Sequence, residues 1–164
     1  MSVTSTEAAK FLCSLSGWSL NRNVLHKLIY IASVVYEGRY HKPLIKHSFS
    51  MIDLHSLKRI DVRNECFVAS SSGPLLKALD KRLSVFGARN VRNIFSDESD
   101  LDSTIHSEEI CVLSECYDAT QSWSLSHFVQ FVMDKNSAWS KTYNPGEHAI
   151  IYDEYLLEEY NFRF

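Results

Sequence analysis

The sequence is short of residues that interrupt regular structure: its 164 residues include only 5 Gly and 3 Pro. Charged residues make up 23% and hydrophobic residues 45%, which excludes a disordered or collagen-like chain. No apolar run approaches the roughly 18 residues that cross a bilayer, and the N-terminus lacks a basic segment followed by an apolar core. We therefore expect a soluble, cytoplasmic protein with one domain over residues 1–164, a length that suits a single hydrophobic core.

Motifs of the common enzyme classes are also missing. The chain has no G-x-G-x-x-G or G-x-x-x-x-G-K-[ST], no G-x-S-x-G and no H-E-x-x-H. The cysteines form no C-x-x-C pair, and we expect all of them to be buried free thiols. They are Cys13, Cys66, Cys111 and Cys116. These absences favour a protein that is not an enzyme and that carries no cofactor or metal.

A few reactive residue types remain to be interpreted. The histidines at 41, 47 and 55 precede Cys66, but their spacing matches no compact zinc site, and we interpret them as loop residues. Cys66 is followed by Phe67 and Val68, which favours a core position over a thiol nucleophile. Adjacent carboxylates on a helix point about 100° apart and are interpreted as solvated faces rather than as an acid–base pair. These pairs are Glu108 with Glu109 and Glu158 with Glu159.

Charge is divided unevenly along the chain, although the net charge is only −3. Residues 1–92 carry +8 and residues 93–164 carry −11. Such a division is found with two domains, with a nucleic-acid-binding half, or with two halves that attract each other across one core. The acidic stretch Ser96–Asp102 marks the change, and because it is short we interpret it as a surface loop within one domain.

Hydrophobic periodicity predicts a mainly α (α+β) fold, a single compact domain of about six helices with two or three short β-strands. Thr4 with Glu7 forms a capping box, while Asn21 or Asn23, Ser124 and Asp153 are expected N-cap residues. Pro74 is expected in the first turn of a helix, and Ile110 on a buried helix face. Helices are expected at 4–17, 21–38, 74–87, 105–117, 124–139 and 153–162, with 54–60 a further candidate for a short helix, and strands at 49–53, 66–69 and 150–151.

Three stretches of the chain share a pattern with a known family. The first stretch is VLHKLIYIASVVYEGRYHKPLIKHSF, which contains Leu-x-Lys-Leu-x-Tyr followed by a Gly and a Pro-Leu. The second is a Gly-Pro pair, and the third is SLSHFVQFVMDKNSAWSKTYNPGEHAI. In this order they resemble the Panacea (SocA-like) antitoxin domain family over residues 7–160. The matching residues are Leu25, Lys27, Leu28, Tyr30, Gly38, Pro43, Leu44, Gly73, Pro74, Leu125, Trp139, Pro145 and Gly146.

The resemblance implies a compact, mainly helical, non-catalytic protein-binding module. Members of the Panacea (SocA-like) family neutralise a toxin by direct binding or deliver it to a protease. The chain departs from the family pattern at Ser70–Ser72, where aromatic residues are usual, and at 134–138, which lack a His before the late Trp. We therefore expect a diverged member with an altered partner surface.

We expect two groups of residues to bind the partner, chosen for their positive charge and expected exposure. A solvated face without a partner is the alternative for both groups. The first group lies in the loop after the second helix and consists of Arg39, Tyr40, His41 and Lys42. The second lies on a basic helix face and consists of Lys77, Lys81 and Arg82.

Two other functions stay open. Basic residues near aromatic ones in the N-terminal half could bind nucleic acid, although the pI of 6.1 and the lack of a known motif weigh against this. The acidic stretch Asp97–Glu109 could instead occupy a phosphate-binding groove. In that case the protein would be a phage- or prophage-encoded inhibitor of a bacterial defence complex (anti-CRISPR-like).

Overall fold

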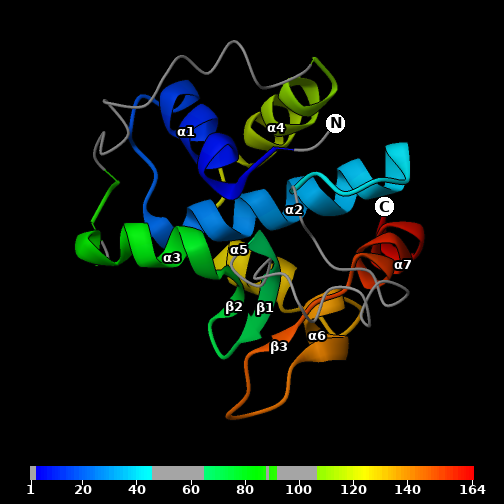
Figure 1. Cartoon of the computed structure of the whole chain (residues 1–164). Helices are drawn as coiled ribbons and strands as arrows, with labels where there is room; N and C mark the ends of the chain where they lie inside the picture. The colour runs from blue at the N-terminus through cyan, green and yellow to red at the C-terminus, as the bar shows by residue number, and fades with distance from the viewer. Residues whose placement is uncertain (1–2, 46–64, 88, 92–106) are drawn as a thin grey trace.

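The computed structural model describes residues 3–45, 65–87, 89–91 and 107–164, which form seven α-helices and a small three-stranded sheet (Figure 1). The expected mainly helical α+β fold is confirmed. None of the helices in these ranges is long and apolar enough to cross a membrane. The helices are α1 (Ser5–Leu15), α2 (Arg22–Tyr40), α3 (Lys77–Leu83), α4 (Ser107–Thr120), α5 (Leu125–Val132), α6 (Ala138–Thr142) and α7 (Asp153–Arg163). The strands are β1 (Phe67–Ser70), β2 (Gly73–Leu76) and β3 (Ala149–Ile150), and a 3-10 turn, η3 (Ser84–Phe86), follows α3.

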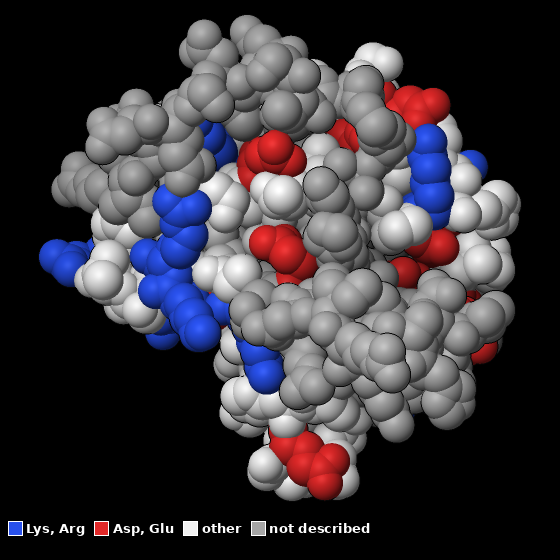
Figure 2. Space-filling view, viewed as in Figure 1, with Lys and Arg blue, Asp and Glu red and all other residues white. Residues whose placement is uncertain are grey.

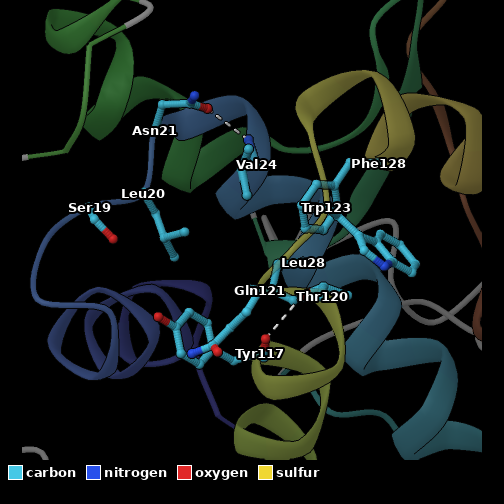
Figure 3. A pocket seen from close by; sticks show the side chains of 10 residues that line it. All are labelled: Ser19, Leu20, Asn21, Val24, Leu28, Tyr117, Thr120, Gln121, Trp123 and Phe128. Atoms are coloured by element: carbon cyan, nitrogen blue, oxygen red, sulfur yellow. Dashed lines mark hydrogen bonds between the residues drawn. The ribbon is translucent and has the colours of Figure 1, made fainter.

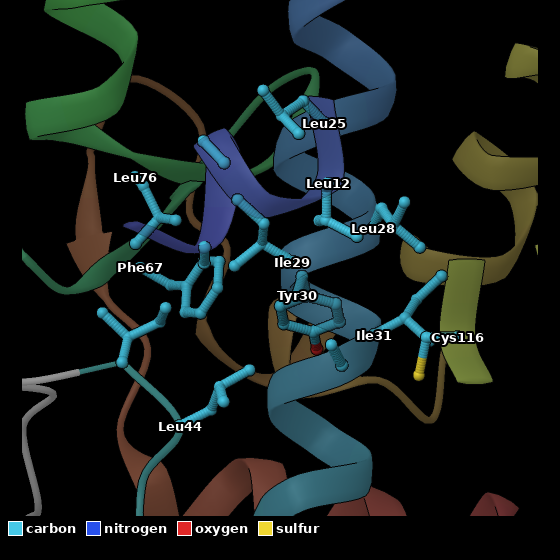
Figure 4. Packing of buried hydrophobic residues seen from close by; sticks show 14 of the residues in the cluster. Leu12, Leu25, Leu28, Ile29, Tyr30, Ile31, Leu44, Phe67, Leu76 and Cys116 are labelled. Carbon is cyan, nitrogen blue, oxygen red and sulfur yellow. The ribbon is translucent and has the colours of Figure 1, made fainter. Parts of the chain in front are cut away.

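Helix α2 is the centre of the domain. Asn21 caps it by accepting a hydrogen bond from the Val24 amide at 3.0 Å, and every residue over 25–37 is buried. A helix with apolar residues on most sides must be covered on most sides, and α2 contacts α1, α4, α5, α7 and β2. In Figure 4, Ile29 points toward Phe67, whereas Ile31 points toward Cys116 of α4.

The sheet packs against α2 and holds α6 in place. Strand β1 lies between β2 and β3, and all pairs are antiparallel. The Trp139 indole Nε1 of α6 donates a hydrogen bond to the Ser70 carbonyl at 2.8 Å. The sheet therefore connects the centre of the chain to its C-terminal part.

Pro74 lies in strand β2, so the predicted helix start at this position is wrong. The residue pairs with Ala69 of β1 on an edge strand, where a missing N–H interrupts no central ladder. Helix α3 begins only at Lys77. A Gly-Pro pair after an apolar strand fits a strand edge as well as a helix start, and the pairing with β1 decides between them.

Other local predictions had mixed outcomes. The capping box is confirmed, with Thr4 and Glu7 bonded in both directions. The helix expected over 124–139 is two helices, because Ser137 caps a separate α6. The N-cap of α7 is Tyr152 rather than Asp153, and Ile110 is exposed rather than buried. The expected strand at 49–53 and helix at 54–60 lie outside the described residues.

Candidate functional site

The two groups of predicted contact residues lie toward opposite ends of α2 (Figure 1). Asp80 of α3 lies 3.6 Å from the His26 imidazole and 3.9 Å from the Arg22 guanidinium, both in the first half of α2. Arg39 is in the last turn of the same 19-residue helix, which is about 28 Å long. The structure therefore does not bring the two groups together on one surface.

The group at the end of α2 is bound to α4 by ion pairs. Arg39 Nη1 lies 2.7 Å from Glu115 Oε2, and Lys42 Nζ lies 3.1 Å from Glu108 Oε2. The hydrogen bonds in these pairs lower the pKa of both carboxyl groups below the usual value for Glu. Glu108 and Glu115 both belong to residues 93–164, the acidic part of the chain. Some of the opposite charges of the two parts of the chain are therefore paired with each other within the domain.

The aromatic residue of this group is packed and its histidine is exposed. Lys42 Nζ lies 5.7 Å from the ring centroid of Tyr40 and 5.9 Å from that of Tyr36, which is the range of cation–π contacts. His41 is the C-cap of α2, with a φ of 55°, and its side chain is exposed. The loop is thus held against α2 and α4.

The basic group on α3 lies at least partly at the surface. Figure 2 shows Lys and Arg side chains gathered over α3, at the left of the view. Lys81 and Arg82 are exposed and Lys77 is half-buried. The carboxylate of this helix, Asp80, faces Arg22 and His26 of α2 instead. The face of α3 is therefore a basic surface, as its sequence predicts.

An apolar pocket of about 330 Å³, which the sequence did not indicate, lies beside Arg39. Its walls come from α2, from α4, from the α4–α5 corner, from α5 and from the last residue of the chain. Arg39 and Glu115 supply its charged side. The residues that line it are Ile31, Val35, Arg39, Glu115, Cys116, Ala119, Thr120, Trp123, Phe131 and Phe164.

A second pocket, of about 390 Å³, also lies at the α4–α5 corner (Figure 3). In the figure, Ser19 and Leu20 lie on one side and Phe128 and Trp123 on the other. We call it the polar pocket, because Ser19, Asn21, Tyr117, Thr120 and Gln121 line it beside Leu20, Val24, Leu28, Trp123 and Phe128. None of these side chains is charged. Thr120 and Trp123 line both pockets, which are therefore neighbours.

The adjacent carboxylates are not simple solvated faces. Glu109 and Glu159 are buried, at 0% and 1% exposed, while their neighbours Glu108 and Glu158 form ion pairs at the surface. Because neighbours on a helix point about 100° apart, one carboxylate of each pair turns into the core. The prediction that both members are solvated is wrong for both pairs.

Glu159 is the centre of a buried hydrogen-bond network. Its Oε1 accepts from the Tyr30 hydroxyl at 2.5 Å and from the Ala138 amide at 2.7 Å, and its Oε2 accepts from Arg163 Nη1 at 2.9 Å. Burial nevertheless raises the pKa of Glu159 above the usual value for Glu. The network joins α2, α6 and α7, and its groups are occupied with one another.

Lys27 is a buried ammonium group that sequence periodicity did not single out. The residue is 3% exposed, and burial lowers the pKa of its side chain. Gly73 lies beside it, because a Cβ atom on Gly73 would be 3.5 Å from Lys27 Nζ. In the sequence, Lys27 is part of the Leu-x-Lys-Leu-x-Tyr pattern that resembles the Panacea (SocA-like) family.

The cysteines and histidines form no reactive centre within the described ranges. Cys66 is buried, and burial raises the pKa of its thiol to about 12, which keeps the sulfur protonated and unreactive. Cys111 is exposed, so the prediction of four buried thiols is wrong for this residue. Among described residues, no three or more His, Cys, Asp or Glu side chains come together to hold a metal ion; the histidines at 47 and 55 lie outside these ranges.

No protein-family model, curated protein or solved structure matches the chain. The function must therefore be inferred from the chemistry of the surface. That surface offers two neighbouring pockets at the α4–α5 corner and a basic face on α3.

Proposed function

We propose that this chain is a non-catalytic, antitoxin-like protein-binding module that neutralises a partner protein by binding it or by delivering it to a protease. The apolar pocket beside Arg39 is the observation that carries the proposal. Protein interfaces concentrate their binding energy in a few pockets lined by aromatic residues and arginine. Trp123, Phe131 and Arg39 line this pocket together.

Two further observations support a partner at this end of the molecule. Phe164 is 49% exposed where it borders the pocket, and a partner would cover that apolar surface. Arg39 is one of the residues selected from the sequence, and its pairing with Glu115 fixes its orientation. The resemblance of α2 to the signature helix of Panacea (SocA-like) antitoxin domains supports the same function.

A second candidate function, the binding of nucleic acid, is favoured by the basic face of α3. Lys81 and Arg82 are exposed there, and Asp80 is directed to α2. Such a face would attract a phosphate backbone. The third possibility, inhibition of a defence complex through Asp97–Glu109, depends mostly on residues outside the described ranges. Within those ranges, Glu108 is paired with Lys42 and Glu109 is buried.

Capture of the partner followed by a growth test examines the proposed function. The tagged chain is purified from its native host, and proteins that co-purify in stoichiometric amount are identified by mass spectrometry. Each is then produced in a bacterium, alone and together with the chain. We expect the partner alone to stop growth and co-production to restore it. A captured protein that never impairs growth would contradict the antitoxin-like function.

Charge-reversal variants separate the first two candidate functions. Lys81→Glu with Arg82→Glu should leave partner capture intact, whereas Arg39→Ala should weaken it. Lys135→Glu, at another exposed position, is the matched control for an added negative charge. Recovery of nucleic acid that depends on Lys81 and Arg82 and falls steeply with salt would favour the second candidate instead.

A further inference from the structure

We infer that the partner engages the α4–α5 corner with an uncharged segment, which places an aromatic or branched aliphatic side chain in the apolar pocket and a neutral hydrogen-bonding side chain in the polar pocket. This inference rests on the proposed function and specifies the chemistry of the partner at that site.

The two pockets are held at a fixed separation. Thr120 and Trp123 stand between them and line both. The Thr120 hydroxyl donates to the Cys116 carbonyl at 2.7 Å, and the Trp123 amide donates to the Thr120 carbonyl at 3.0 Å. The turn that separates the pockets is thus anchored to α4, and one continuous segment can reach both sides of it.

The apolar pocket is suited to one large apolar side chain. Ile31 and Val35 of α2 and Ala119 of α4 line it together with aromatic residues. Cys116 adds a thiol that burial keeps neutral, since its pKa is raised to about 12. A volume of about 330 Å³ is at the small end of the range for ligand pockets. An aromatic or branched aliphatic side chain is the occupant that gains most from such walls.

The polar pocket is suited to an amide or a hydroxyl group. Asn21 Oδ1 accepts from the Val24 amide, which leaves the Asn21 NH₂ group as a donor. The Gln121 amide and the Tyr117 hydroxyl can each donate and accept. Leu28 and Phe128 supply apolar contact beside these groups. A neutral polar side chain can be bonded here without a charged partner.

Charge argues against an acidic or basic segment. The only charged side chains that line the two pockets in the described ranges are Arg39 and Glu115, which are paired at 2.7 Å. A charge brought into either pocket would lose hydration without gaining an unpaired opposite charge. The two parts of the chain carry +8 and −11, so a charged partner finds stronger attraction elsewhere on the molecule, such as on α3.

Peptide selection tests this inference directly. A library of short random peptides displayed on phage is selected against the full chain, and enriched peptides are synthesised for affinity measurements. We expect neutral peptides with an aromatic or aliphatic anchor next to an amide or hydroxyl residue. Their affinity should change little between low and high salt, because no exposed charges attract each other across the interface.

Pocket-filling variants locate the binding site. Ala119 and Gln121 are exposed and line the apolar and the polar pocket respectively. Ala119→Trp and Gln121→Trp add bulk without removing a core side chain, and each should weaken peptide affinity at least about tenfold. Gln130→Trp, at an exposed position of α5 outside both pockets, is the matched control and should bind like the wild type. Urea unfolding checks that all three variants fold.

Three results would overturn the inference: enriched peptides that are charged, binding that neither pocket variant weakens, or a library that yields no binder. Failure of the proposed function looks different. If Ala119→Trp and Gln121→Trp still neutralise the captured partner fully, the inference is wrong and the antitoxin-like function stands. If peptides bind as expected but the captured protein is harmless to growth, the proposed function is wrong and the binding site stands.

Discussion

Gly38 of α2 lies directly against the ring of Tyr160 of α7: a Cβ atom on Gly38 would be 2.0 Å from Tyr160 Cγ. Gly38 is not among the glycines with positive φ, so this position needs a glycine for space and not for backbone conformation. The close approach lets α7 pack along the end of α2, next to the Arg39–Glu115 pair.

Gly38→Ala should destabilise the domain by about 2–4 kcal/mol, because the new methyl group overlaps a ring and forces α2 and α7 apart. At an unobstructed helix position the same change would stabilise by about 0.5–1 kcal/mol. Urea unfolding measures the difference. In the double variant with Tyr160→Ala, the penalty of the added methyl group should largely disappear. An increase in stability for Gly38→Ala alone would contradict the packing described.

Tyr30→Phe should cost about 1–3 kcal/mol of unfolding free energy, because Glu159 is buried and loses the hydroxyl that donates to its Oε1. Thermal or urea unfolding measures this loss. Tyr155→Phe is a matched control at a half-buried position, and it should change stability by less than about 0.5 kcal/mol. Equal effects of the two substitutions would show that the network around Glu159 adds no stability.

Features of the fold that depend on near neighbours in the chain could be predicted from the sequence. The Thr4–Glu7 capping box and the Asn21 and Ser124 caps need only residues within one turn of a helix. The structure around Pro74 could not be predicted from near neighbours, since its strand, β2, forms by pairing with β1. The burial of Glu159 likewise depends on Tyr30, which is 129 positions away.

Little of the candidate site could be predicted. The exposed charge of Lys81 and Arg82 follows from the pattern of a single helix, and the structure agrees. The pairing of Arg39 with Glu115 joins α2 to α4, so no local pattern contains it. The two pockets draw their walls from segments far apart in the chain. Trp123, between two predicted helices, was the signal that could have directed attention to the corner.

Lys27→Met should stabilise the protein by about 1–3 kcal/mol at pH 7, because it removes a buried ammonium group and keeps an unbranched side chain. Burial lowers the pKa of Lys27, so the destabilisation is complete below the folded-state pKa and disappears as pH rises toward the unfolded value near 10.5. The gap between variant and wild type should therefore close in alkaline solution. Urea unfolding at several pH values measures it, and a less stable Lys27→Met protein at pH 7 would contradict this account.

Cys111 should be the thiol that reacts first with a water-soluble disulfide reagent in the folded protein. It is exposed, whereas Cys13, Cys66 and Cys116 are buried. Its thiol donates to Glu115 at 3.3 Å, and this hydrogen bond raises the pKa of Cys111, so the reaction should be slower than that of a free thiol at the same pH. Absorbance of the released thiolate measures the rate. Cys111→Ser should abolish the early phase, and an unchanged early phase in that variant would contradict the assignment.

Glu37 should make the domain less stable as pH rises from acid to neutral. Burial, with the nearby charge of Glu154 adding to it, raises the pKa of Glu37 to about 7. The unfolded chain releases this proton near pH 4.5 and the folded chain only near pH 7, so stability falls across that interval and stays lower above it. The loss at pH 8 is of the order of 3 kcal/mol for this one group.

Glu37→Gln tests this pH dependence, because the amide keeps the shape of the protonated carboxyl and does not titrate. We expect the variant to be more stable than the wild type at pH 8 and nearly equal to it at pH 5, as measured by urea unfolding at both values. Glu147→Gln, at an exposed position, is the matched control and should leave the pH dependence unchanged. If Glu37→Gln follows the wild-type pH profile, another group carries the titration, and the contact between α2 and α7 does not hold a proton on Glu37 at neutral pH.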